Sequence, residues 1–275
     1  IIESRFVKSK IIYLGDADQL VPVGNTNSPV FNSSGPKAEL SQVVRQAAGN
    51  PIIDAATMFR HAVRTGEFAP INTDPHHVIH CDQDDFEKRI LEEFNRPDWK
   101  HQDSKVLLWT NDGAVDYNNA IRNEVQGQPE FQVGDYAICN SFVKGGTSAP
   151  MIKANTTVQL QGVEPAYSNG VAGHNYKIKG SWYFMPLVRA DRNALEKTLH
   201  ASGDFGTLKS IDDEWIDLRA VYACTINKSQ GSTYDKVFID LNNMRKCYNG
   251  NTLARLLYVA VSRARHQVVM TGDLA

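Results

Sequence analysis

The sequence predicts an α/β protein with a parallel β-sheet and a small β-rich segment inserted into it. Two short runs of β-branched and aromatic residues, 221–225 and 236–241, are bounded by polar turns and predict buried strands. A helix is expected over 252–265 and a third strand over 267–271. Strands that alternate with a helix are typical of a parallel sheet. From about Phe131, short alternating runs broken by Gly, Pro and Asn predict an inserted antiparallel barrel or sandwich.

The elements that precede the insertion follow from local signals. Asn50 is a good helix cap, Pro51 suits the first turn, and Gly66 suits the position after the last turn. These residues predict a helix that begins at Asn50-Pro51 and stops near Gly66. The other elements expected here are strands over 10–15, 77–80 and 105–110, a short helical stretch over 40–46, and a helix over 84–95.

Within the insertion we expect four strands and one helix. The strands lie over 131–138, 157–161, 176–179 and 182–188, and the helix lies over 192–201. The segment 210–215 contains adjacent acidic residues and is expected to be a linker back to the sheet.

The composition of the 275 residues limits the kind of partner. The net charge of −2 excludes a broad basic surface, so any nucleic-acid contact should be local. The four cysteines are widely spaced and indicate reduced thiols of an intracellular protein. No apolar run approaches the length of a membrane span and no signal peptide opens the chain, so we expect a cytoplasmic protein without membrane contact. His76, His77 and His80 have no carboxylate or cysteine at ligand spacing, so no metal site is expected there.

Arg263 falls on or beside the apolar stripe of the helix expected over 252–265. A guanidinium in that position loses hydration and needs an anionic partner. The partner could be a carboxylate, or the side chain could reach water at the helix end. It could also be a phosphate, whose oxygens match the planar fork of arginine. The spacing alone leaves these alternatives open.

Polar side chains follow two of the predicted strands. The segment 225–231, Thr-Ile-Asn-Lys-Ser-Gln-Gly, leaves the carboxyl end of a strand, which is the edge where open α/β sheets bind ligands. Its hydroxyls, carboxamides and lysine suit a sugar-phosphate backbone. Asp16 and Gln19 come just after the strand expected over 10–15, where they could orient water, magnesium or a phosphate, or simply form a turn.

Five segments carry a resemblance to a known family. Residues 225–235 and 257–265 closely resemble motifs V and VI of the superfamily 1 DNA helicases, in the RecD-like and Dda-like branch, superfamily 1B. Motif V usually has a histidine where this chain has Asn227. Residues 15–23 are similar to motif III, GDxxQLPPV, with Val21 in place of the first proline.

The two further matches are shorter. Arg45-Gln46 resembles motif IV of these helicases. Residues 110–122 resemble motif IVa, in which Thr110 and Asn111 would touch the DNA backbone and Asn119 would brace the following helix.

The resemblance implies a RecA-like parallel sheet, helicase domain 2A, interrupted by a small β-rich SH3-like domain, 2B. It places the end of RecA-like domain 1A, including motif III, at residues 1–36. Domain 2A then comprises residues 37–139 and 220–275, on either side of a 2B insertion at 140–219.

The resemblance also implies which residues act. Arg45 and Arg263 would be arginine fingers on the γ-phosphate of ATP, and Gln19 would sense that phosphate. The residues implied in binding ATP, with its Mg²⁺, are Gly15, Asp16, Gln19, Arg45, Gly231 and Arg263. The residues implied in contact with the backbone of single-stranded DNA are Thr110, Asn111, Thr225, Asn227, Lys228 and Ser229. A further group could stack on the strand or could instead be barrel core and solvated lysines, and it comprises Lys177, Lys179, Trp182 and Tyr183.

The sequence GxxxxGK[ST], which forms the loop that cradles the β-phosphate, does not occur in the chain. The resemblance therefore implies the latter part of a longer helicase that moves 5′ to 3′, with an N-terminal RecA-like domain as the missing partner. Alone, the chain is expected not to hydrolyse ATP. Two other hypotheses stay open: a catalytically inactive DNA- or partner-binding module with a degenerate RecA-like fold, and a nucleotidyl or phosphoryl transferase.

Overall fold

The computed structural model describes residues 11–21, 29–32, 35–38, 49–128, 130–145 and 149–274. The helical stretch expected over 40–46, and Arg45 with it, lies outside these residues. The chain forms two compact units, the first from residues 1–82 and 229–275 and the second from residues 83–228. The domain boundaries expected from the sequence stay a prediction.

The first unit contains parallel strands covered by helices. Strand β11 (Ala264–Thr271) lies between β1 (Val78–Cys81) and β10 (Tyr234–Asp240), and both neighbours run parallel to it. The helical elements of this unit are η1 (Pro29–Asn32), α2 (Pro51–Thr65), α8 (Leu241–Met244) and α9 (Gly250–Val261). The parallel strands expected over 77–80, 236–241 and 267–271 are confirmed.

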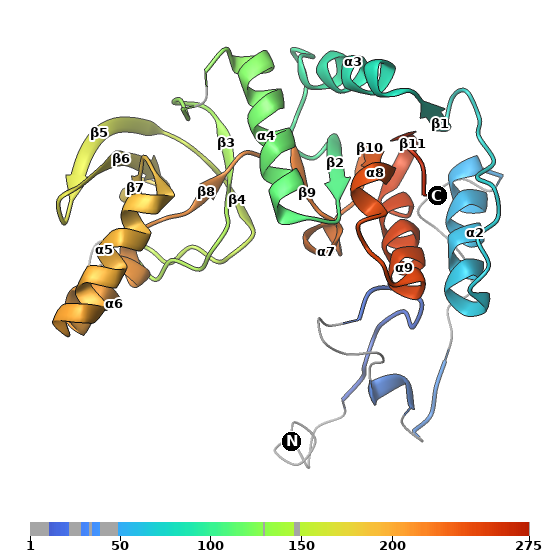
Figure 1. Cartoon of the computed structure of the whole chain (residues 1–275), viewed down its shortest axis with the longest axis horizontal. Coiled ribbons are helices and arrows are strands. Elements are labelled where there is room, and N and C mark those ends of the chain that lie inside the picture. The colour runs from blue at the N-terminus through green and yellow to red at the C-terminus, as the bar shows by residue number, and fades with distance from the viewer. Residues whose placement is uncertain are drawn as a thin grey trace. The chain divides into compact units, whose positions relative to one another are not determined.

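Helix α2 begins and ends where its capping residues predict. The Asn50 side chain accepts a hydrogen bond from the Ile52 amide, and Gly66 closes the helix in the left-handed conformation with φ of 80°. The apolar face of α2 packs against α9, and the two helices lie side by side in Figure 1. A hydrogen bond from the Asn251 amide to the Val63 carbonyl joins them.

Helix α9 ends earlier than its sequence pattern predicts. It stops at Val261, so Arg263 lies beyond the helix and Ala264 already belongs to β11. The expected helix over 252–265 is therefore wrong at its end. The reason is that β11 pairs with β10 from Ala264 onward, and this pairing requires an extended backbone.

The strand expected over 10–15 is also absent from residues 11–15. A strand needs the backbone of a neighbour to complete its hydrogen bonds, and no described strand pairs with this segment. Its apolar side chains remain in contact with solvent, with Ile12 82% and Leu14 91% exposed.

The second unit has its own pair of parallel strands, β2 (Ser104–Leu108) and β9 (Ala223–Thr225). Helices α3 (Gln83–Phe94) and α4 (Asn111–Gln126) accompany them, and the short helix α7 (Ile226–Ser229) follows β9 at the unit boundary. The strands expected over 105–110 and 221–225 and the helix expected over 84–95 are confirmed.

The insertion is β-rich and antiparallel, as predicted. Its strands form two sheets of three, β4-β3-β8 and β5-β6-β7. These strands are β3 (Tyr136–Cys139), β4 (Thr156–Gln159), β5 (Gly162–Ser168), β6 (Val171–Ile178), β7 (Ser181–Pro186) and β8 (Leu218–Arg219). One apolar core, which includes Val158, Tyr176 and Leu218, joins the two sheets. The SH3-like character of this insertion stays a prediction.

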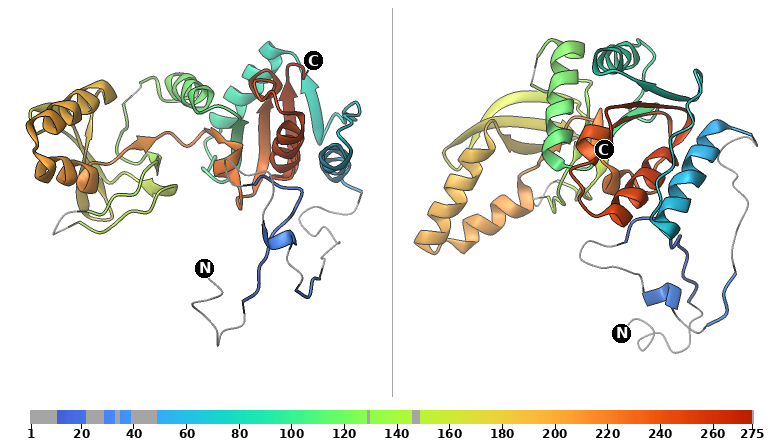
Figure 2. Two further views of the ribbon diagram at one scale, coloured as in Figure 1. Left: turned by 60° about the horizontal axis from the view of Figure 1, so that its bottom comes forward. Right: turned by 45° about the vertical axis from the view of Figure 1, so that its right-hand side comes forward.

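Two helices accompany the insertion, where the sequence predicted one. Helix α5 (Arg189–Ser202) confirms the helix expected over 192–201, whereas α6 (Phe205–Glu214) replaces most of the expected linker over 210–215. Asp204 caps α6, and Ile211 packs with Trp215 in an apolar cluster. Figure 2 shows the two helices in orange beside the yellow strands. A linker would leave these apolar side chains in water.

Candidate functional site

The segment that follows residue 15 is fastened to the first unit through Asp16. One carboxylate oxygen of Asp16 accepts hydrogen bonds from the Tyr258 hydroxyl at 2.9 Å and from the Gln19 side-chain amide at 3.2 Å. The other oxygen accepts from the backbone amide of Asp18 at 2.9 Å. Asp16 therefore fixes the side chain of Gln19 and ties the whole turn to helix α9.

Asp18 fastens the same turn to helix α2. Its Oδ2 atom accepts from Arg60 Nε at 2.7 Å and from Arg64 Nη2 at 2.6 Å. Burial by itself raises the pKa of the Asp18 carboxyl, but the hydrogen bonds and charges of Arg64 and Arg60 outweigh burial and lower the pKa. Asp18 is thus an ionised carboxylate held between two guanidinium groups.

Arg255 completes the attachment by binding the backbone of the turn. Its Nη1 atom donates to the carbonyl oxygens of Ala17 at 2.5 Å and Gln19 at 2.8 Å, while Asn251 accepts from its Nε atom. Sequence analysis missed this role of Arg255. The spacing of Asn251, Arg255 and Tyr258 on one helix face is the signal that could have found it.

Arg60, Arg64 and Tyr258 were also missed. Arg60 and Arg64 lie four residues apart, which places them on one face of α2 and could have indicated a shared anion. Burial raises the pKa of Tyr258 to about 12, and its hydrogen bond to Asp16 adds to this shift. Tyr258 is therefore a neutral hydroxyl donor at any physiological pH.

Arg263 lies two residues beyond α9 and is only 2% exposed. Three of its hydrogen bonds go to neutral oxygens, the carbonyls of Val259 and Ser232 and the hydroxyl of Ser262. Gly231, with φ of 83°, directly precedes Ser232, so the turn of motif V and the arginine of motif VI meet here. The desolvation expected from the sequence is present.

The described candidate nucleotide residues form two groups, each in contact with helix α9. Gly15, Asp16 and Gln19 lie on a turn attached to α9 through Tyr258 and Arg255, and the chain that leaves the same helix reaches Arg263 and its contact with the Gly231 turn. Arg45 lies outside the described residues. Helix α9 therefore contacts both the segment that contains Asp16 and Gln19 and the Arg263 side chain.

Five of the candidate DNA residues gather at one edge of the second unit, whereas Ser229 belongs to the first unit. Strands β2 and β9 are parallel neighbours with Leu108 opposite Thr225, so the segments that follow their carboxyl ends lie side by side. Among the candidates in these segments, Asn111, Asn227 and Lys228 are exposed. These three side chains place amide and ammonium groups where a backbone phosphate could reach them.

The hydroxyl-bearing candidates are less accessible. The Thr110 side chain caps α4 by accepting from the Gly113 amide at 3.1 Å. Thr225 and Ser229 are buried. Their contact with a nucleic acid stays a prediction, and the structure gives Thr110 a capping role as well.

Asn118 fixes the position of the strand end that carries Thr225. Its Oδ1 atom accepts from the backbone amides of Tyr222 at 3.0 Å and Ala223 at 2.9 Å, and its Nδ2 atom donates to the Ala223 carbonyl. The resemblance implies that Asn119 braces the following helix, but Asn119 is exposed. The bracing residue is therefore Asn118, because its side chain lies on the buried face of α4.

The basic and aromatic residues of the insertion do not form one surface; they are Lys177, Lys179, Trp182 and Tyr183. Tyr183 is buried and donates its hydroxyl to the Pro150 carbonyl at 2.6 Å, so it belongs to the core. Trp182 is partly exposed and lies beneath the Lys177 ammonium at 5.7 Å from the ring centre. Lys179 occupies a turn with φ of 49°.

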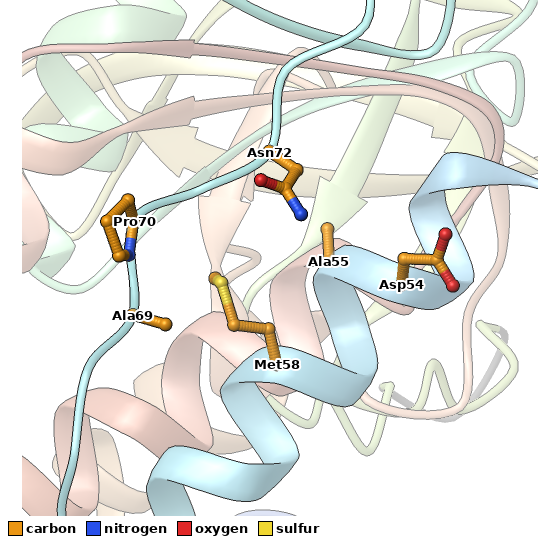
Figure 3. A pocket seen from close by; sticks show the side chains of 6 residues that line it. All are labelled: Asp54, Ala55, Met58, Ala69, Pro70 and Asn72. Atoms are coloured by element: carbon orange, nitrogen blue, oxygen red, sulfur yellow. The ribbon is translucent and has the colours of Figure 1, made fainter.

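A hollow of about 280 Å³ lies beside helix α2 in the first unit, lined by Asp54, Ala55, Met58, Ala69, Pro70 and Asn72. In Figure 3 the Met58 side chain rises from the helix toward the segment that carries Ala69 and Asn72. None of the predicted site residues lines it. Its single charged group and shallow form give it no evident chemistry.

The described residues contain neither a metal-binding cluster nor a membrane-spanning helix. No group of three or more His, Cys, Asp or Glu side chains there is arranged to hold a metal ion. In the same part of the chain, every helix is too short or too polar to cross a membrane.

Comparison with known proteins matches the segment that contains these motifs. Residues 220–271 match the family described as the UvrD-like helicase C-terminal domain. The ATP-dependent RecD2 DNA helicase of Deinococcus radiodurans is 25% identical over 276 residues, which cover 96% of this chain and 33% of that protein. The chain therefore spans about a third of the length of this relative.

Two solved structures are similar at low identity. The Pif1 helicase from Bacteroides in complex with ADP-AlF3 and ssDNA is 14% identical with a TM-score of 0.44, covering 95% of this chain and 61% of that one. The Pif1 helicase from Candida albicans is 15% identical with a TM-score of 0.42, covering 84% and 55%. Residues 220–271 are thus similar to the UvrD-like helicase C-terminal domain, and the chain is similar to the C-terminal part of the RecD-like helicases of superfamily 1B.

Proposed function

We propose that this chain is the C-terminal part of an ATP-dependent DNA helicase that moves 5′ to 3′ on single-stranded DNA. The observation that carries the proposal is the attachment of the motif III turn to the motif VI helix through Asp16 and Tyr258. Closure of a nucleotide site brings the phosphate sensor and the arginine to the same phosphate, and a direct contact between the elements that carry them couples the two. The Arg255 contacts with the carbonyls of Ala17 and Gln19 support the same coupling.

In this proposal, Arg263 and Arg45 are arginine fingers that stabilise charge on the γ-phosphate during hydrolysis. Gln19 senses the phosphate, and the turns at Gly15-Asp16 and Gly231 line the nucleotide. ATP supplies the phosphoryl group and Mg²⁺ neutralises its charge when both are bound.

The DNA track of the proposal is the shared edge of β2 and β9. Asn111, Asn227 and Lys228 are its exposed members. Thr110 caps the helix that follows β2, and Thr225 and Ser229 are buried candidates beside the exposed ones in the chain. Amide and ammonium donors bind phosphate and sugar oxygens, which carry no base identity. We therefore expect binding of single-stranded DNA without sequence preference.

An N-terminal RecA-like domain is the proposed partner, because the nucleotide would lie between two such domains. The exposed side chains of Ile12 and Leu14 support this proposal. Exposed apolar side chains in this segment suit a surface that packs against another domain. That domain would supply the phosphate-binding loop, so this chain alone should not hydrolyse ATP.

The experiment that tests the proposal is DNA-stimulated ATP hydrolysis by the full-length protein. Arg263→Ala should lower kcat by about a thousandfold, the lower range for an arginine finger, and should leave ATP binding largely intact. Because Arg263 is buried, circular dichroism must show that the variant is folded, and Arg263→Lys provides a second variant that keeps the charge. Arg265→Ala is the matched control, since Arg265 is half-exposed and pairs with Asp235 at 3.1 Å.

Unchanged turnover in a folded Arg263→Ala protein would remove the arginine-finger assignment. A full-length protein that binds single-stranded DNA but hydrolyses no ATP would instead support the inactive DNA-binding module.

A further inference from the structure

The Lys228 ammonium donates a hydrogen bond to the side-chain oxygen of Asn140. Lys228 is exposed at the edge that we assign to DNA, and Asn140 is the first residue after β3. We propose that Asn140 is a positioning residue that aims the Lys228 ammonium at a phosphate of the DNA strand. The inference rests on the proposed function and adds a residue to it.

The orientation of the Asn140 amide is fixed by Asp217. Asn140 Nδ2 donates to Asp217 Oδ2 at 3.0 Å, and the Asn140 backbone amide donates to the Asp217 carbonyl at 2.7 Å. A carboxylate only accepts hydrogen bonds, so the amide nitrogen must face it. The amide oxygen is then left to face Lys228, as the observed contact requires.

Asp217 is itself held by a guanidinium. Arg219 Nε lies 2.9 Å from Asp217 Oδ1, and Arg219 Nη2 lies 3.2 Å from Oδ2. This two-pronged contact compensates the carboxylate charge and fixes its plane. Arg219, Asp217, Asn140 and Lys228 form a continuous chain, which we call the neck network.

The neck network leaves one positive charge uncompensated, that of Lys228. The ammonium is held by a neutral amide, and only one of its three N–H groups is needed for that contact. A carboxylate in place of Asn140 would cancel the charge of the lysine and would lose the hydrogen bond to Asp217. A neutral holder therefore suits a lysine that must attract a phosphate.

The location of the network explains what it does. Asn140 and Asp217 lie where the chain leaves β3 and re-enters β8, just beyond the paired residues Cys139 and Leu218. They border β3 and β8, the first and last strands of the insertion, which together form its neck. Lys228 follows β9, so the neck of the insertion fixes a side chain of the DNA edge.

The test measures binding of fluorescein-labelled oligothymidylate to the purified chain by fluorescence anisotropy at several KCl concentrations. Lys228→Ala should weaken binding and reduce the slope of log K against log salt by about 0.7, the value for one phosphate contact on a single strand. Asn140→Ala should weaken binding about three- to tenfold, the effect of one lost hydrogen bond. In the Lys228→Ala background, Asn140→Ala should add almost nothing.

Asn140→Asp is the variant that separates positioning from simple support of the fold. Its carboxylate cancels the charge of Lys228 and no longer donates to Asp217, so the salt slope should fall as it does in Lys228→Ala. Asn175→Ala is the matched control, because Asn175 is another asparagine of this unit that donates to a carboxylate, that of Glu164. It should leave both affinity and slope unchanged, and circular dichroism checks the fold of every variant.

Equal weakening by Asn140→Ala in the wild-type and Lys228→Ala backgrounds would overturn the positioning role while leaving the DNA edge in place. A wild-type chain that fails to bind oligothymidylate, or a Lys228→Ala variant that binds like wild type, would overturn both this inference and the Lys228 contact proposed above.

Discussion

The Tyr258 hydroxyl donates to Asp16 Oδ2 at 2.9 Å and so joins residues that are 242 positions apart in the chain. Tyr258 lies on α9, the helix that leads to Arg263, and Asp16 also binds the side chain of Gln19. This single contact connects the turn that resembles motif III with the helix that resembles motif VI. The stability of the folded chain should depend on this contact, on the ion pairs of Asp18 and, in the second unit, on the hydrogen bonds of Asn118.

Tyr258→Phe removes the hydroxyl and keeps the ring. We expect a loss of about 1 kcal/mol in the free energy of unfolding, because one hydrogen bond to a carboxylate is lost while Asp16 keeps two others. Urea unfolding followed by circular dichroism measures this change. Tyr248→Phe is the control, since Tyr248 is 98% exposed and its replacement should not shift the midpoint. Equal midpoints for both variants would contradict a structural role for the Tyr258 contact.

Tyr258 should also make the fold sensitive to alkali. Burial and the Asp16 hydrogen bond raise its pKa from 10.0 to about 12 in the folded chain. Its contribution to stability is therefore complete below pH 10 and is lost as the pH rises through about 12. The unfolding midpoint should fall less steeply over this range in Tyr258→Phe than in wild type. Parallel curves would rule out this titration.

Asp18→Asn should destabilise the first unit and remove part of its acid sensitivity. The hydrogen bonds of Arg64 and Arg60 lower the folded pKa of Asp18 below 3.8, although burial opposes them. Its contribution is present above pH 3.8 and is lost as the pH falls through the lower folded value. We expect a loss of about 1 to 2 kcal/mol at neutral pH, reduced by the partial exposure of both arginines.

The measurement for Asp18 is the unfolding midpoint between neutral pH and about pH 2. Asp235→Asn is the control, because its partner Arg265 and Asp235 itself are both half-exposed. That change should cost less than about 0.5 kcal/mol. A wild type and an Asp18→Asn variant with the same acid profile would contradict an ionised, paired Asp18.

Asn118→Ala should be the most destabilising of these changes. It deletes three hydrogen bonds to the backbone of Tyr222 and Ala223 and leaves buried amide groups without them. We expect a loss of about 3 kcal/mol in the free energy of unfolding. Asn119→Ala, on the exposed side of the same helix, should change it by less than about 0.5 kcal/mol. Similar midpoints for the two variants would contradict the bracing role of Asn118.

Hydrogen exchange read at the Thr225 amide provides a second check on Asn118. Protection there should fall in Asn118→Ala and persist in Asn119→Ala, because only Asn118 holds the backbone that leads into Thr225.

The sequence by itself determined the local elements and the residue types at the strand ends. Asn50, Pro51 and Gly66 specify where α2 begins and ends, because caps act within one turn. The apolar runs likewise specify β10, β11 and the parallel strands near them. Motifs of consecutive residues also carried the helicase resemblance, which the comparisons confirm at residues 220–271.

Only the tertiary structure decided which distant groups meet. The pairing of β11 with β10 ends α9 at Val261, a boundary that helical periodicity cannot reveal. Three other contacts join residues that are far apart in sequence. They are the ion pairs of Asp18, the hydrogen bonds by which Asn118 and not Asn119 braces the strand end, and the contact between Asn140 and Lys228. The physical reason is that local propensity acts over a few residues. A buried carboxylate or amide instead hydrogen-bonds to a donor that the packing of distant elements brings within about 3 Å.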